Sequence, residues 1–440
     1  MTALRGRDYR NLLAAGLISE TGDWLLLVAL PILVYEITGS TLGTAIAFLG
    51  ELVPPILLGT FAGRLADRWN RRRALIWLSV AQAATLLPLL FAGGRLWVVY
   101  AVIAVQAGLA TFTEPTRNAL VPAVTPREHL VQANSLLALT GNLGRLVGGP
   151  LGGLLLALGD LPTIVVVDAV SFGLAAVLYA RIRTGQGTRA SGTTEVGGGA
   201  GYDHRRIRAG LVVAGLSAVA QGMFVVLFVP FVYRELHGGA DEAGLLRGVQ
   251  AIGAIAAGLL LGLLARRCRA GVLAAAGMAA FGVVGLLTWN GSLVTTETPV
   301  YVVLFVVVGA PGVVAVTGLF SALQEAGGNR VGRVFGALTT VFAAGQAIGM
   351  IAGGLLGDRV DLVALLNVQA GLYLTAALVA AVGLVTADGP ARTDGEKGRP
   401  PSGETGVANE SGSGGFEPNP LGDSGGMQPP SVNQGNTAKT

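Results

Sequence analysis

The sequence predicts an all-α, polytopic membrane protein with twelve transmembrane helices in two pseudo-symmetric halves of six. Three observations predict it: an apolar composition, regularly spaced apolar segments of bilayer length, and an internal repeat. Of the 440 residues, 52% are hydrophobic and 13% are charged, and the mean hydropathy is +0.62. One soluble core cannot bury so many apolar side chains, so most of them are expected to face lipid.

Twelve apolar segments are long enough to cross a membrane, because about 20 helical residues span a hydrocarbon core of about 30 Å. The first segment begins with arginines and lacks the cleavage site of a removable signal peptide, so we expect it to remain. The predicted spans are 11–37, 42–65, 74–92, 96–114, 134–158, 162–181, 208–233, 243–265, 271–290, 298–321, 334–357 and 361–386.

Arginine is distributed unevenly between the loops. Alternate loops contain arginine at 68–73, at 117 and 127, and within 181–206, 266–269 and 330–333, whereas the opposite loops are mainly acidic. Because cytoplasmic loops retain basic residues, these loops and both termini are predicted to be cytoplasmic. The net charge of +4 therefore comes from loops between spans, which argues against a nucleic-acid partner. Lysine occurs only at Lys397 and Lys439, which indicates a GC-rich bacterial genome and a cell-membrane location.

Two polar, Gly-rich stretches divide the chain. The first separates the spans into six and six, and its composition is typical of a flexible linker. The second has scarcely a large apolar residue and cannot offset the entropy of folding. The predicted parts are an N-terminal transmembrane half at 1–181, a cytoplasmic linker at 182–207, a C-terminal transmembrane half at 208–386 and a disordered cytoplasmic tail at 387–440.

An internal repeat relates the two halves. Glu51 and Gly63 recur as Gln250 and Gly262 at an offset of 199 residues. Four glycines recur at an offset of 201, namely Gly144, Gly148, Gly152 and Gly153 as Gly345, Gly349, Gly353 and Gly354. Two agreeing registers predict parallel repeats, an arrangement in which a substrate site lies near the bilayer midplane between the halves.

A strongly charged segment, 63–73, joins the second and third predicted spans. Arginines beside a span ordinarily only fix topology, but here a small residue is followed by an acid and then by bases. The segment resembles the loop between helices two and three of the major facilitator superfamily, with matches at Gly63, Leu65, Ala66, Asp67, Arg68, Arg71 and Arg72. Asn70 stands where that family most often has glycine, and asparagine tolerates the left-handed angles of such a turn.

Smaller motifs resemble the drug exporters of that superfamily, which include macrolide efflux proteins and the enterobactin exporter. They are Gly22-Asp23-Trp24, Gly39-Ser40, Glu51 with Pro54, and 119–122 followed by 133–135. The resemblance implies proton-coupled efflux of a small amphipathic molecule, such as a drug, a macrolide or a siderophore-like compound, by alternating access. It implies a lipid bilayer as the surroundings, protons as the coupling ion, a functional monomer and no cofactor.

The resemblance also implies a conformational latch formed by Gly63, Asp67, Arg68 and Arg72. The Asp67 carboxylate is expected to accept hydrogen bonds from the N-terminus of the eleventh span, near Phe335, and to stabilise the outward-open state. The alternative is that Asp67 only neutralises the adjacent arginines.

Charged residues inside the spans are functional candidates, since each costs about 2.5–3.5 kcal/mol or more at the membrane centre unless it faces protein or water. We identified five, all in the first half, which leaves the second half a mostly apolar wall. Asp23, with Ser19 and Glu20 on its helix face, is the first candidate proton carrier, followed by Glu51 and Glu20. Arg145 and Asp168 are candidates for a buried ion pair. Alternatively, Asp23 or Glu51 is a permanently ionised partner of a buried arginine.

Candidate residues for a substrate cavity are Trp24, Gln106, Gln221 and Phe224, although aromatic side chains also serve in packing and at lipid interfaces. The chain contains no H-E-x-x-H helix, no cysteine pair and no phosphate-binding G-x-x-x-x-G-K-[ST] loop, so we expect neither an enzyme nor a metal site. Two alternatives stay open: a membrane sensor or assembly factor on a transporter fold, and an importer or exchanger of a metabolite.

Overall fold

The computed structural model describes residues 6–68, 70–126, 129–158, 161–183, 203–264 and 268–385. The side chains of residues 60, 63–68, 131, 138, 263–264 and 329 are outside this description. The chain divides into two compact units, Met1–Gly389 and Pro390–Thr440, and all described residues belong to the first. Residues 184–202 of the predicted linker and the whole predicted tail lie outside the described residues.

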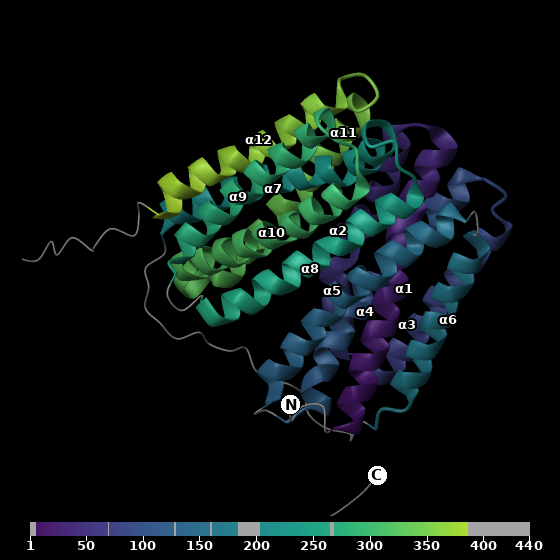
Figure 1. Cartoon of the computed structure of the whole chain (residues 1–440). Helices are drawn as coiled ribbons and strands as arrows, with labels where there is room; N and C mark the ends of the chain where they lie inside the picture. The colour runs from purple at the N-terminus through teal and green to yellow at the C-terminus, as the bar shows by residue number, and fades with distance from the viewer. Residues whose placement is uncertain are drawn as a thin grey trace, which may run out of the picture. The chain divides into compact units, whose positions relative to one another are not determined.

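Twelve long helices make up most of the described chain (Figure 1). Short 3-10 or π-helical turns extend several of them. The helices are α1 (Arg7–Thr38), α2 (Thr41–Arg68), α3 (Arg71–Leu86), α4 (Leu96–Val124), α5 (Leu130–Ala157), α6 (Leu161–Ala180), α7 (His204–Pro230), α8 (Ala240–Leu264), α9 (Ala270–Asn290), α10 (Thr298–Gly327), α11 (Val331–Leu356) and α12 (Leu362–Ala380).

Eleven of the described helices are long and apolar enough to cross a membrane. The remaining long helix, α5, has 28 residues, and Asn142, Arg145 and its many glycines lower its hydropathy. The predicted all-α, twelve-helix membrane fold is therefore confirmed. The π-helical turn Phe231–Glu235 continues α7 to the end of its predicted span.

Helix α4 shows the largest error in the predicted boundaries. It continues through Pro115 and Pro122 to Val124, ten residues beyond the predicted end at 114. The Thr116 hydroxyl donates to the Phe112 carbonyl at 2.7 Å, inside the continuous helix. Arg117 consequently lies within α4 and not in a loop, so its use as evidence for loop charge was wrong.

The helix contacts repeat between the halves of the described chain. Helix α1 packs against α5 and α6, α2 against α4, and α3 against α4 and α6. The equivalent pairs, six helices later, are α7 with α11 and α12, α8 with α10, and α9 with α10 and α12. The main contacts between the halves, α2 with α11 and α5 with α8, are likewise equivalent. This correspondence confirms the predicted pseudo-symmetry.

The repeated glycines make equivalent close contacts. A Cβ added at Gly148 or Gly152 of α5 would overlap the backbone of α1, and one at Gly349 of α11 would overlap the backbone of α7. The last glycine in each repeat faces the opposite half: Gly153 lies against α8, and Gly354 lies against α2. Small residues allow such close helix packing in membranes. The glycine pattern therefore fixes packing both within and between the halves.

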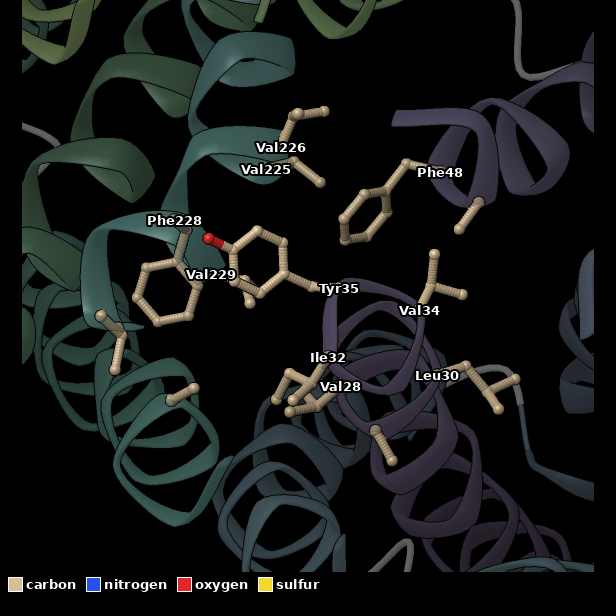
Figure 2. Close-up of a cluster of buried hydrophobic side chains, with 14 of the residues drawn as sticks. Val28, Leu30, Ile32, Val34, Tyr35, Phe48, Val225, Val226, Phe228 and Val229 are labelled. Carbon is tan, nitrogen blue, oxygen red and sulfur yellow. The ribbon is translucent and has the colours of Figure 1, made fainter. Parts of the chain in front are cut away.

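A continuous apolar core also joins the halves. It contains buried side chains from α1, α2 and α7, among others. Figure 2 shows Tyr35 of α1 directed toward Phe228 and Val229 of α7, with Phe48 of α2 on its other side. The Tyr35 and Tyr233 rings meet edge to face at 5.5 Å between centroids. This packing holds α1 and α7 together near the α1–α2 connection.

The bundle has two ends, which we name after one residue at each. At the Arg72 end, Arg72 Nε donates to the Tyr179 carbonyl at 3.3 Å, and the Arg183 amide donates to Asp8 Oδ1 at 3.1 Å. The starts of α1 and α3 therefore lie beside the end of α6. The opposite end contains the α1–α2 and α11–α12 connections and is called the Asp358 end.

Candidate functional site

A cavity of about 290 Å³, called the first cavity, lies among α1, α2, α3, α4 and α6. Several apolar side chains of α1 and α4 complete its wall. Its charged lining residues are five acids and one base: Glu20, Asp23, Glu51, Glu114, Asp168 and Arg117. A cavity so rich in carboxyl groups can attract protons or cations.

Glu20 of α1 and Arg117 of α4 form an ion pair inside the bundle. The Arg117 guanidinium donates to Glu20 Oε1 at 2.7 Å, and the two side chains are only 11% and 21% exposed, respectively. Arg117 Nε has no hydrogen-bond partner in the described structure. Glu20, a predicted proton carrier, is thus ion-paired with Arg117, which was predicted to lie in a loop.

Asp23 is on the same face of α1, one turn further along the chain. The Ser19 hydroxyl donates to Asp23 Oδ2 at 3.4 Å, as the predicted spacing of four residues allows. Asp23 lines the first cavity, and no ion pair to its carboxyl group occurs among the described residues. This position suits a group that gains and loses a proton through the cavity.

The predicted pair of Arg145 and Asp168 is not brought together. Asp168 of α6 is fully buried against Gly22 of α1, where a Cβ would overlap its Oδ1 atom. Arg145 of α5 instead reaches across to α8, because close packing at Gly149 and Gly248 brings the two helices together. Close packing at Gly22, Gly149 and Gly248 therefore determines where Asp168 and Arg145 lie. Attraction between the two charges does not.

Arg145 joins the two halves directly. Its Nε donates to the Arg247 carbonyl at 3.0 Å, and its terminal nitrogen donates to Gln250 Oε1. The guanidinium also lies over the Trp24 ring, 5.2 Å from the centroid, which is a favourable cation–π distance. Gln250 is the repeat equivalent of Glu51, so the second half supplies a neutral acceptor at this level.

A second cavity of about 320 Å³ lies between the halves. Helices α1 and α2 line one side, and α7, α8 and α11 line the other. It shares Leu27, Pro31 and Glu51 with the first cavity. Glu51 faces this cavity together with Arg247 of α8, so opposite charges from the two halves line one space.

Arg247 and Arg117 were missed as functional candidates. Arg247 falls inside the predicted eighth span, and the same reasoning that selected Arg145 applies to it. Its guanidinium lies 5.0 Å from the Phe224 ring centroid and 5.8 Å from that of Phe228. The predicted apolar wall of the second half therefore contains a cation. For Arg117, the signal was the nearby Glu114, one helical turn before it.

The four predicted cavity residues take different positions. Trp24 and Gln106 line the first cavity, and Gln221 lines the second. Gln106 donates to the Gln82 carbonyl at 3.0 Å, and Gln221 accepts from Tyr373 at 3.2 Å. Phe224 is buried against Phe228, Trp289 and Arg247 and does not line either cavity.

Of the predicted latch, the structure describes only the Arg72 side chain. Arg72 binds the carbonyls of Tyr179 and Ala180 and thereby caps the end of α6, where a cation is favourable. The surroundings of Gly63 and the side chains of Asp67 and Arg68 lie outside the description. Asn70 has extended angles (φ −69°, ψ 100°) and caps α3 by accepting from the Arg73 amide at 3.1 Å. Asn70 therefore does not use the left-handed angles that asparagine tolerates, and its side chain serves as a cap.

A hydrogen-bonded cluster around Asp358, which we call the Asp358 clasp, joins the halves at the opposite end. Asp358 Oδ2 accepts from the Thr41 amide at 2.9 Å and the Ser40 hydroxyl at 3.1 Å, and Oδ1 accepts from Arg234 at 2.6 Å. The carboxylate therefore caps the N-terminus of α2. Burial alone would raise the pKa of Asp358, but the hydrogen bonds from Arg234, Thr41 and Ser40 outweigh it, and the pKa is lowered.

Neighbouring contacts reinforce the Asp358 clasp. Arg234 Nε donates to the Tyr35 hydroxyl at 2.8 Å, and Tyr233 donates to Glu36 at 2.6 Å. The Thr41 hydroxyl donates to the Gly354 carbonyl at 2.9 Å. At this end, α1, α2, α7 and α11 are thus held together by polar contacts. Among the described residues, no group of three or more His, Cys, Asp or Glu is placed to hold a metal ion.

Known proteins are similar to this chain in sequence and in fold. The family model for the Major Facilitator Superfamily matches residues 12–207 and 210–421. The uncharacterised transporter YfiS of Bacillus subtilis is 29% identical over 169 residues, covering 38% of this chain and 40% of YfiS. The multidrug efflux pump Tap of Mycolicibacterium fortuitum is 31% identical over 233 residues, 50% of this chain and 52% of Tap. The chain thus spans about half the length of these relatives or less.

A longer match is to macrolide efflux protein A of Streptococcus pyogenes, which is 24% identical over 350 residues, 74% of this chain and 83% of that protein. A bacterial homologue of the iron transporter ferroportin has a similar structure, with a TM-score of 0.63 and 19% identity over 86% of this chain and 98% of that one. The POT family transporter PepTSo has a TM-score of 0.68 at 11% identity, over 87% and 98% of the two chains. The structural likenesses concern the fold alone.

Proposed function

The chain belongs to the major facilitator superfamily, and from that premise we propose that it is a secondary active transporter of the cell membrane that exports a small amphipathic molecule in exchange for protons. The observation that carries the proposal is the first cavity. Its five carboxyl groups face one guanidinium, which is already paired with Glu20. Acids in a membrane-embedded cavity are expensive and mark ion or proton pathways.

The cavity lining also bears on the substrate. Trp24 and the apolar side chains of α1 supply an apolar wall, while Asp23, Glu51 and Glu114 supply negative charge. Such a lining favours an amphipathic molecule with a protonated amine over an anionic one. The names of Tap and macrolide efflux protein A support a drug or a macrolide as the exported class.

Alternating access is proposed to involve the halves 1–181 and 208–386, with Asp23 as the proton carrier and Glu51 as the second candidate. We place both termini in the cytoplasm and take the monomer as the functional unit. Asp67 remains the proposed latch residue at the Arg72 end. In the proposed cycle, a proton from outside reaches Asp23, substrate leaves, and deprotonation toward the cytoplasm restores a cavity that binds the next substrate.

The test is accumulation of fluorescent drugs and siderophores in efflux-deficient cells that express the protein, with and without a protonophore. We expect lower accumulation that disappears with the protonophore and in Asp23→Asn. The control is Glu297→Gln, which changes an exposed carboxyl group before α10 and should export normally at equal expression. Proton-dependent export by Asp23→Asn would remove Asp23 from the carrier role. No difference across a broad panel, even for the unmodified chain, would favour the sensor alternative.

A further inference from the structure

Asp168 differs from the other acids of the first cavity because its residue is completely buried, and like Asp23 it has no ion pair among the described residues. Its residue is 0% exposed, and its Oδ1 atom accepts one hydrogen bond, from the Ser171 hydroxyl at 3.1 Å. The other oxygen, Oδ2, is buried and has no hydrogen-bond partner in the described structure. An ionised carboxylate in that position would leave a buried charge almost uncompensated.

No charged group described near Asp168 pairs with it, because the basic groups bind other residues and the remaining charged groups are acidic. On α1, Gly22 lies in close contact with the Asp168 carboxyl group, and Glu20 and Asp23 line the same cavity. On α4, Arg117 is bound to Glu20 and lies beside the acidic Glu114.

The remaining helices packed against α6 supply no cation to Asp168. From α3, the cavity receives the uncharged Gln82, and Arg72 binds the carbonyls at the end of α6. From α5, Arg145 binds α8. The 3-10 turn Leu87–Phe91 contains no ionisable residue. The side chains described around Asp168 therefore offer it no ion pair.

The lack of a partner cation is accounted for if the Asp168 side chain is a neutral carboxylic acid. Protonation removes the negative charge, and an uncharged buried polar atom without a partner costs far less than a buried ion. We propose that Asp168 is a second proton-binding residue: it is protonated in this conformation, and when the halves rock and no longer enclose it, it passes its proton to the Asp23 carboxylate across the first cavity. In that step the Oδ2–H bond of Asp168 breaks, an O–H bond forms on Asp23, and the negative charge moves from Asp23 to Asp168.

Gly22 is the positioning residue for this step. It precedes Asp23 on α1, and any Cβ there would overlap both Asp168 Oδ1 and the Ser171 hydroxyl. The absence of a side chain thus lets the Asp168 carboxyl group lie directly beside the backbone that carries Asp23. The inference rests on the proposed proton exchange for its role in transport, whereas the protonation of Asp168 itself does not depend on transport.

Infrared spectroscopy of the purified protein in lipid nanodiscs tests the protonation directly, since a neutral carboxyl group has a carbonyl stretch distinct from that of a carboxylate. We expect such a band at neutral pH, its loss in Asp168→Asn, and its retention in the matched control Glu114→Gln, an exposed acid of the same cavity. An unchanged band in Asp168→Asn, or no band in the unmodified protein, would overturn the proposal.

Thermal unfolding and transport complete the test. Asparagine resembles the neutral acid in shape, so Asp168→Asn should unfold near the temperature of the unmodified protein. A large drop would show that the ionised form is required, and would contradict the proposal. In transport, Asp168→Asn is expected to lose substrate export driven by a pH gradient while it retains substrate exchange. If the infrared result holds but the unmodified protein shows no proton-driven transport, only the proposed function fails.

Discussion

At the scale of single residues, the first cavity shows two ways in which a membrane protein contains buried acids. Glu20 is paired with a cation, whereas Asp168 is enclosed without one. Both acids could be predicted as functional candidates, because an ionisable residue inside a span is costly unless it faces protein or water. Their surroundings could not be predicted: Glu20 pairs with Arg117, and Arg145 binds α8 and not Asp168 as expected, since pairing depends on which helix faces lie together.

The Glu20–Arg117 pair gives a prediction about stability. Arg117→Gln leaves Glu20 as a buried, unpaired carboxylate, so it should destabilise the protein by about 3–5 kcal/mol. Equilibrium unfolding in mixed micelles measures the change. The double variant Glu20→Gln with Arg117→Gln should recover much of the loss, because neither charge then remains.

Additive losses in the double variant would contradict this account, since additivity is expected only for independent sites. The control Glu297→Gln removes an exposed carboxyl group and should leave stability nearly unchanged.

At the scale of elements, apolar length and periodic glycines were sufficient to predict all twelve helices, but not where α4 ends. Charged residues and proline usually end an apolar span, and α4 contains Glu114, Pro115 and Arg117 in succession. The helix continues because the Arg117 guanidinium forms an ion pair with the Glu20 carboxylate inside the bundle. Such compensation depends on tertiary contacts, so the extension of α4 and the position of Arg117 inside the bundle could not be predicted from the sequence. Arg247, in contrast, lies inside a predicted span and could have been selected in the same way as Arg145.

The close packing of α1 and α5 gives a second prediction. Gly152→Ala should destabilise the protein by about 1–3 kcal/mol, because the new methyl group overlaps the Leu25 carbonyl of α1. The matched control is Gly173→Ala in α6, where a Cβ meets nothing within 4 Å. There, alanine should be neutral or stabilise by up to about 1 kcal/mol through helix propensity. Equal effects of the two variants in thermal unfolding would show that the helix contact is not tight.

At the scale of the whole described bundle, the same two helices, α2 and α11, are proposed to connect the halves at both ends of the bundle during the cycle. Asp358, just after α11, caps the start of α2. The proposed latch is the reciprocal arrangement, in which Asp67 at the end of α2 would cap the start of α11. The two contacts would lie at opposite ends of the same helix pair, so rocking the halves would strengthen one and weaken the other.

The Asp358 clasp predicts a specific pH dependence. Because its pKa is lowered in the folded protein, the ionised carboxylate contributes stability that is present above the unfolded pKa of about 3.9 and is lost as the pH falls through the lower folded value. Asp358→Asn should therefore lower the unfolding temperature at neutral pH, by an amount equivalent to about 1 kcal/mol for a partly exposed cluster.

The difference between Asp358→Asn and the unmodified protein should begin to shrink below about pH 4 and should approach zero only below the lowered folded pKa of Asp358, where both carry a neutral side chain at this position. Thermal unfolding at a series of pH values measures it, with Glu297→Gln as a variant that should show no such trend. A difference that persists in acid would mean that the shape of the side chain, and not its charge, closes the clasp.

The glycine contacts of α5 also affect how the protein can evolve. They place backbone against backbone, so the positions that hold α5 to α1 and α8 are separate from those whose side chains line the cavities. A substitution at Gln106 of α4, for example, can alter the cavity wall without disturbing these contacts. Single substitutions in the cavity wall can therefore change substrate preference, whereas a side chain at these glycine positions would overlap a neighbouring helix.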